Sequence, residues 1–155
     1  MALTAQDMIQ TANEAIALLK MRVYEKNEDL DGKDFKPYST RPLAIQPNSQ
    51  TFKSLKPKGG IKTKNGGVFY KGGYREYKRS STGSDQVNLT LSGNLLQSIQ
   101  VKEADADGFV IGPTGTATKY ALKVHEARSF IGVTDDELEI LKEIIIAKLL
   151  NGGRI

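Results

Sequence analysis

The last part of the chain carries a helix signal that restricts the fold to architectures in which a terminal helix packs against other elements. Thr134 and Glu137 have the spacing of a capping box, and Asn151-Gly152-Gly153 supplies a stop. Between them, apolar residues recur at three- and four-residue steps. Further apolar residues widen this surface beyond one stripe: Ile140, Ile146 and Leu150. We therefore expect a helix that either packs under a sheet and an arm or contributes to a subunit interface.

A second helix is expected near the N-terminus. Thr4 and Asp7 form an N-cap pattern close to the capping box, with aspartate where Glu or Gln is commoner. One apolar face follows at helical spacing: Met8, Ala12, Ala15, Ile16, Leu19 and Val23. This helix should end within residues 24–27.

Regular patterning is lost between residues 27 and 67. Four of the five prolines lie there, at positions 37, 42, 47 and 57. Each proline removes a backbone donor and biases its predecessor towards extended geometry. Asp31-Gly32 and Asn65-Gly66 are local turn signals. We expect an extended arm or loop over 27–67.

Two hairpins are expected in the middle of the chain. Residues 68–70 and 74–77 are rich in Tyr and Phe and flank Gly72-Gly73, which is typical of strands joined by a turn. A second pair of strands is expected at 99–101 and 109–111, with ADADG as their turn, and a further strand or short helix at 119–126. The whole pattern predicts an α+β fold in a single domain, 1–155, with both terminal helices on one side of a mostly antiparallel sheet.

In the stretch LTLSGNLLQSIQV, residues 89–101, the spacing of the apolar residues changes twice, from strand-like to helix-like and back. Leu89 and Leu91 are expected to end a strand, and Ser92-Gly93 to make a turn that caps a short helix. Ser92 is either a nucleophile or a cap. Because no histidine or acid is placed by the sequence to activate it, we interpret it as a cap.

The residue inventory excludes several kinds of chemistry. The chain has no cysteine, so disulfides, thiolate catalysis and cysteine-ligated metal sites are excluded. Its one histidine, His125, is followed by Glu126, but no G-x-S-x-G motif accompanies the pair, and we interpret His125 as structural. The carboxylates that could be imagined on magnesium have local explanations in a hairpin turn and a helix cap: Asp105, Asp107, Asp135, Asp136 and Glu137.

We therefore expect no catalytic residue, no cofactor and no metal, and a protein that is not an enzyme. The Gly-rich pieces KPKGGIKTKNGG and IGPTGTAT match neither phosphate-binding pattern. MALTAQDMIQ lacks the order of a secretory signal, and the most apolar window, 140–150, is interrupted by charges. We expect no membrane segment and an intracellular or assembly compartment.

Positive charge is concentrated between Lys53 and Arg79. This segment holds nine Lys or Arg and one acid, a net charge of +8, whereas the whole chain is +4. Such a segment either contacts phosphates and stacks bases, or is solvated or meets acidic protein surfaces. Its candidate contact residues are Lys62, Lys64, Lys71, Arg75, Lys78 and Arg79.

Three motifs follow one another along the chain: LDGKDFKPYST, then YREYKRSSTGSDQVNLTLSGNLLQSIQV, then FVIGPTGTATKYALKVHEARSFIGVTDDELEILKEI. This ordered set resembles the phage virion morphogenesis family, the tail-completion and head–tail joining proteins of Mu-like and other tailed phages. The motifs cover most of the chain from Leu30 to Ile144. The family usually has a glycine soon after the histidine and an R-P-F, where this chain has His125-Glu126-Ala127 and Arg128-Ser129-Phe130.

The resemblance implies a non-enzymatic structural protein of the virion. It implies a ring, often a hexamer, at the neck or tail end, acting as tail terminator or neck adaptor. Its partners would be further copies of itself, the tail tube and the head-connector proteins, with passive contact to DNA in the lumen. Candidate contacts in the arm are Phe35, Pro37 and Tyr38. The alternatives are a nucleic-acid-binding module that uses residues 53–79 and a metal-dependent nuclease.

Overall fold

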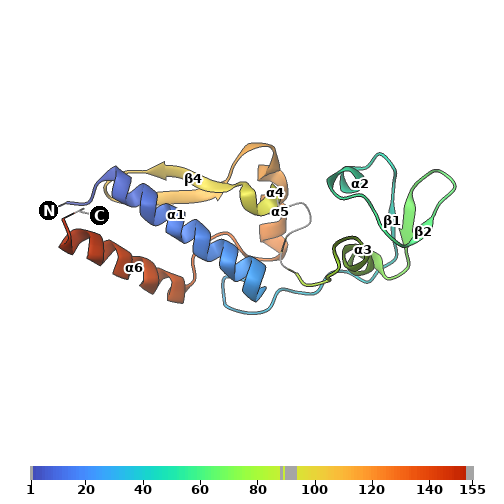
Figure 1. Cartoon of the computed structure of the whole chain (residues 1–155), viewed down its shortest axis with the longest axis horizontal. Helices are drawn as coiled ribbons and strands as arrows, with labels where there is room; N and C mark the ends of the chain where they lie inside the picture. The colour runs from blue at the N-terminus through green and yellow to red at the C-terminus, as the bar shows by residue number, and fades with distance from the viewer. Residues whose placement is uncertain (1, 88, 90–93, 153–155) are drawn as a thin grey trace. The chain divides into compact units, whose positions relative to one another are not determined.

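The chain forms two compact units in a computed structural model that describes residues 2–87, 89 and 94–152 (Figure 1). The terminal unit spans Met1–Phe35 and Asn94–Ile155, and the central unit spans Lys36–Gly93. The expectation was one domain with an arm. The difference arises because residues 36–93 have a hydrophobic core of their own, described below.

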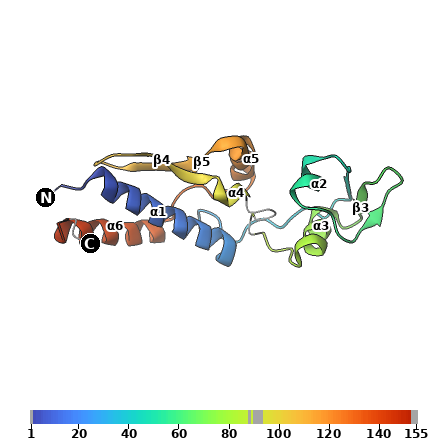
Figure 2. The same cartoon turned by 45° about the horizontal axis from the view of Figure 1, so that its top comes forward.

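Helix α1 (Ala5–Met21) is the middle layer of the terminal unit. It packs on one side against the antiparallel hairpin of β4 (Ile99–Ala104) and β5 (Phe109–Pro113), and on the other against α6 (Asp135–Leu150) (Figures 1 and 2). This arrangement confirms the α+β class with both terminal helices on one side of an antiparallel sheet. Three short helices complete the unit: α4 (Asn94–Gln97), the 3₁₀ turn η2 (Gly115–Ala117) and α5 (Thr118–Ala127).

The start of α1 follows the predicted cap. The Asp7 carboxylate accepts a hydrogen bond from the Thr4 amide at 2.8 Å, and the Thr4 hydroxyl accepts one from the Asp7 amide at 3.2 Å. The predicted apolar face is buried, from Met8 to Val23. Beyond Met21 the helix widens into a π-helical turn, η1 (Arg22–Lys26), and ends at Asn27 in the left-handed conformation.

The β4–β5 hairpin is in the predicted place. Its register pairs Val101 with Ile111 and Ala104 with Phe109, with a bulge between Val101 and Glu103. The Asp105 carboxylate accepts hydrogen bonds from the amides of Asp107 and Gly108. That aspartate therefore closes the turn, as expected from its position.

The central unit has a three-stranded antiparallel sheet in the order β1-β3-β2. The strands are β1 (Leu43–Ile45), β2 (Ile61–Lys62) and β3 (Val68–Tyr70), accompanied by α2 (Gln50–Ser54) and α3 (Gly73–Thr82). Its core is made of Ile45, Val68, Tyr70 and Tyr77. The expectation of an extended arm or loop over 27–67 is therefore wrong for part of that segment, because β1, α2 and β2 all lie within it.

Buried tyrosine hydroxyls attach the proline-containing segment to this core. The Tyr70 hydroxyl donates to the Lys58 carbonyl at 2.6 Å, and the Tyr77 hydroxyl donates to the Leu55 carbonyl at 2.8 Å. Burial raises the pKa of Tyr77 to about 12, so it remains a donor at neutral pH. These long-range hydrogen bonds order a segment whose own sequence has no periodic pattern.

The hairpin expected at 68–70 and 74–77 is wrong in its second half. Val68–Tyr70 is a strand, but residues 74–77 lie in α3. Tyr74 and Tyr77 are one helical turn apart and both pack on the core, which a strand with alternating faces would not allow. The Glu76 carboxylate accepts from the Gly72 amide at 2.6 Å and holds the start of this helix.

The remaining predictions concern residues 89–101, 119–126 and 134–151. Leu89 is in no strand, whereas Leu91 and the predicted Ser92 cap lie outside the described residues. The short helix after it is confirmed as α4, the 119–126 segment is helical, and the capping box of Thr134 and Glu137 is present. In the described part of the chain, no helix is both long and apolar enough to span a membrane.

The start of α3 generates a stability prediction. Gly73 has a φ of +74°, and a Cβ there would lie 2.3 Å from the Arg41 carbonyl oxygen. Gly83, which ends α3, has a φ of +85° but open space around it. We expect Gly73→Ala to destabilise the central unit by about 2–4 kcal/mol, and Gly83→Ala by about 1 kcal/mol. Amide hydrogen exchange in β1 and β3 measures this; equal effects of the two changes would contradict the steric argument.

Candidate functional site

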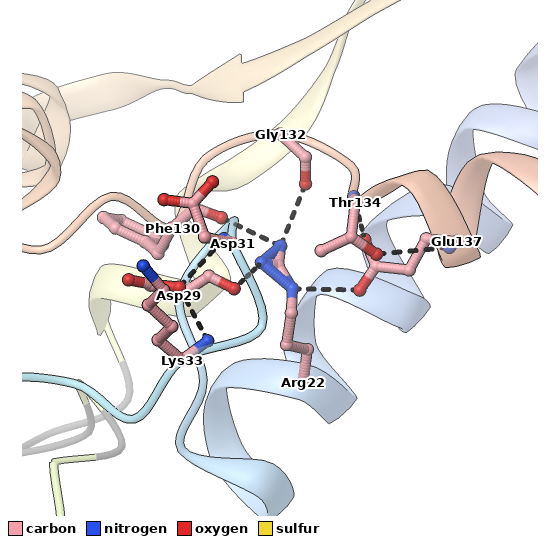
Figure 3. A network of polar contacts seen from close by, with 8 residues as sticks. All are labelled: Arg22, Asp29, Asp31, Lys33, Phe130, Gly132, Thr134 and Glu137. Carbon is pink, nitrogen blue, oxygen red and sulfur yellow. Dashed lines mark hydrogen bonds and ion pairs between the residues drawn. The ribbon is translucent and has the colours of Figure 1, made fainter.

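Arg22 connects three segments of the terminal unit through one buried guanidinium (Figure 3). Its Nε donates to Glu137 Oε1 at 2.9 Å, its Nη2 donates to the carbonyls of Phe130 and Gly132 at 3.1 and 3.0 Å, and its Nη1 donates to the Asp29 carbonyl at 3.3 Å. The side chain is 3% exposed. The end of α1, the loop after it and the segment leading into α6 are thereby held together.

Glu137 performs two functions at once. One carboxylate oxygen pairs with Arg22, and the other accepts from the Thr134 amide at 2.9 Å, which is the reciprocal half of the capping box. The cap orients the carboxylate, so the buried ion pair has its hydrogen bonds satisfied, as such pairs require. Burial lowers the pKa of Arg22, while the Glu137 carboxylate opposes this shift.

A cavity of about 480 Å³ lies beside this pair. Its apolar lining includes Met21, Val133 and Ile140, which are 41%, 37% and 44% exposed. Its acidic lining consists of Glu137 and four further carboxylates: Glu28, Asp31, Asp135 and Asp136. With Glu137 paired to Arg22, these four acids face one free-standing basic group of the lining, Lys26, and the cavity is acidic.

Sequence reasoning missed this cavity. It interpreted Asp135 and Asp136 as residues of a helix cap, and it did not connect them with Glu28 and Asp31, about a hundred positions earlier in the chain. The Leu30 amide donates to the Ser129 carbonyl at 3.0 Å, and Arg22 brings the same two loops together. Among the described residues, no group of three or more His, Asp or Glu has the arrangement of a metal site.

Lysines dominate the surface of the central unit. Residues 36–93 hold eleven Lys and Arg and two acids, a net charge of +9, which leaves the rest of the chain at −5. Three of the candidate contact lysines are exposed: Lys62, Lys64 and Lys71. Lys62 is in β2 and Lys64 is in the turn that follows it, so the β2–β3 hairpin presents both.

The candidate arginines of α3 are exposed but partly neutralised. Arg75 Nε and Arg79 Nη2 both donate to Asp85 Oδ2, at 2.7 and 2.5 Å. These two hydrogen bonds lower the pKa of Asp85 to about 2. Lys78 differs from its neighbours because it is 2% exposed, and its ammonium donates to the Tyr38 hydroxyl at 3.0 Å.

The candidates from the predicted arm differ in burial and belong to different units. Phe35 is buried in the core of the terminal unit, whereas Pro37 and Tyr38 belong to the central unit. Pro37 is exposed, and the Tyr38 ring lies 5.0 Å from the ring of Tyr74. Phe35 and Lys78 are therefore internal residues rather than contact residues, because each fills a packed environment in its own unit.

His125 has the structural role expected of it. Its Nδ1 accepts hydrogen bonds from the amides of Phe130 and Ile131, both at 3.2 Å, and its ring is 5.9 Å from the Phe130 ring. These bonds shape the segment that bends from α5 towards Arg22.

Neither a protein-family model, nor a curated protein, nor a solved structure matches the chain.

The Arg22 cluster generates a second stability prediction. We expect Arg22→Met to destabilise the terminal unit by about 3–5 kcal/mol, because Glu137 and three carbonyls lose their buried partner. Adding Glu137→Gln should recover part of this loss, since the amide is uncharged and keeps an oxygen for the cap. Urea unfolding followed by circular dichroism measures both variants.

The matched control is Glu139→Gln, which removes the exposed pair with Lys142 on the same helix. It should change stability by less than about 0.5 kcal/mol. An Arg22→Met protein as stable as this control would show that the cluster does not hold the unit together.

Proposed function

We propose that this protein is a structural subunit of a tailed-phage virion, which assembles as a ring at the neck or tail end, completes the tail and joins it to the head. The head–tail role comes from the ordered motifs of the chain. The structure contributes one supporting observation, which is the surface of α6. We place the protein in the virion, and in the host cytoplasm during assembly.

Helix α6 is apolar well beyond the face that it buries. The residues that it buries in the terminal unit are Glu137, Leu141 and Lys148. Large apolar side chains remain exposed around the rest of the helix: Leu138 (41%), Ile140 (44%), Ile146 (53%), Leu149 (40%) and Leu150 (80%). Apolar surface of this kind marks interaction sites in soluble proteins, and a subunit of an assembly would cover it.

We expect the double change Ile146→Asp and Leu150→Asp to abolish assembly without unfolding the subunit. Both residues are more than half exposed, so the charges add little burial cost to the monomer. Mass by light scattering and negative-stain images measure ring formation, and addition to purified heads and tails measures joining. The control replaces the exposed pair of the same helix, Glu139→Gln with Lys142→Gln. A wild-type protein that stays monomeric and ignores tails would refute the proposal.

The basic central unit favours a second candidate, a nucleic-acid-binding module. Its +9 charge and exposed lysines suit a phosphate backbone. On this hypothesis Lys62→Glu with Lys64→Glu weakens binding to duplex DNA and lowers the salt slope by about 2. The control pair, Lys119→Glu with Lys123→Glu, makes the same charge change on α5. No salt-dependent DNA binding by a protein that forms rings would reject this candidate.

A further inference from the structure

We propose that the β2–β3 hairpin of one copy docks in the acidic cavity of the next copy, and that this contact sets the order of subunits in the ring. The inference deepens the proposed ring function and rests on it. Its starting point is the charge separation within the chain, +9 in the central unit against −5 in the rest. Electrostatic attraction between two copies is therefore strongest where unlike units meet.

The β2–β3 hairpin exposes both an apolar side chain and positive charges, which suits it to dock in a cavity of another copy. Ile61 is 63% exposed, and it is the one large apolar side chain that the described part of the central unit leaves so open to water. Lys62 follows it in β2, Lys64 is in the turn after β2, and both are exposed. An apolar residue accompanied by two cations is complementary to a partner surface that is both apolar and acidic.

The hairpin is also held in shape. β2 pairs with β3 through Ile61–Phe69 and Lys62–Val68, and the Thr63 amide donates to the Gly67 carbonyl at 2.9 Å. The Asn65 side-chain amide donates to Gln46 Oε1 at 3.0 Å and ties the turn to the segment after β1. A preformed hairpin loses less conformational entropy on docking than a free loop does.

The cavity beside Arg22 offers the complementary surface. Met21, Val133 and Ile140 give it exposed apolar walls. Its four acids form none of the ion pairs in the described part of the chain, which join Arg22 to Glu137, both α3 arginines to Asp85, and Lys142 to Glu139. The pairing proposed is Ile61 against the apolar walls and Lys62 and Lys64 against Glu28, Asp31, Asp135 and Asp136.

The symmetry of this contact agrees with a ring. The hairpin and the cavity are different surfaces of one chain, so the interface is heterologous and repeats from each copy to the next. In a closed ring of such interfaces, every hairpin and every cavity is occupied. Apart from Ile140, which lines the cavity, the exposed apolar residues of α6 remain available to a different neighbour.

A charge-swap experiment tests the contact. The hairpin variant carries Lys62→Glu and Lys64→Glu, and the cavity variant carries Glu28→Lys and Asp31→Lys. The cavity changes avoid α6, where lysines would oppose the helix dipole. Each variant alone should associate at least about tenfold more weakly than wild type at low salt. In the hairpin variant like charges face each other, and in the cavity variant the lining loses its net negative charge although Asp135 and Asp136 remain. Sedimentation equilibrium measures the association constant.

Mixing the two variants should restore association, because each copy then meets a neighbour with the opposite charge. Two matched controls make the same charge changes elsewhere on the terminal unit: Lys119→Glu with Lys123→Glu, and Glu14→Lys with Glu126→Lys. These should associate as wild type does, alone and mixed. Circular dichroism checks the fold of every variant. Ile61→Asp is an independent test, because it removes the apolar part of the contact without changing the acids of the cavity, and it should also weaken association.

Failure of this contact is distinguishable from failure of the ring. If both charge variants form rings as wild type does, the contact is wrong and the ring proposal stands. If wild type never associates, both are wrong. A monomer that becomes more compact at low salt without gaining mass would show that the hairpin contacts its own chain, and would overturn the contact between copies. Loss of DNA binding by the hairpin variant with unchanged association would overturn it too.

Discussion

The buried pair of Arg22 and Glu137 is the interaction on which the terminal unit depends. Helix α1 is the central layer of this unit, and the guanidinium at its end binds the α6 cap and three loop carbonyls together. Breaking one partner of such a pair costs more than the pair itself contributes, because the other charge stays buried. The same cluster places two acidic loops beside each other, so the geometry of the cavity follows from this one contact.

The central unit depends on a different kind of constraint. Its sheet is small, and its strands are two or three residues long. Tyr70 and Tyr77 are its largest fully buried side chains, and they direct their hydroxyls to backbone carbonyls of the 55–58 segment. Apart from the buried Lys78, the lysines of this unit are exposed. A strongly basic unit with one exposed isoleucine results, and its surface suits partners that carry acidic groups.

The sequence predicted correctly the helix starts and the turn that depend on residues close together in the chain. Both capping boxes and the β4–β5 turn depend on residues three or four positions apart, and the structure confirms them. Helix α3 was missed because Tyr74 and Tyr77 around a Gly-Gly pair suggest a hairpin as readily as a helix. Which one forms depends on Gly73, whose backbone must fit beneath the Arg41 carbonyl. That neighbour is distant in sequence and carries no local signal.

The sequence by itself determined the α+β class, the positions of the terminal helices, the structural role of His125 and the concentration of positive charge in the middle of the chain. Tertiary structure decided that the middle forms a unit of its own, that Phe35 and Lys78 are internal, and that four acids share one cavity with apolar walls. The physical reason is the range of the forces. Capping and periodicity act within a few residues, whereas burial and charge pairing join groups about a hundred residues apart, and one sequence does not state which groups will meet.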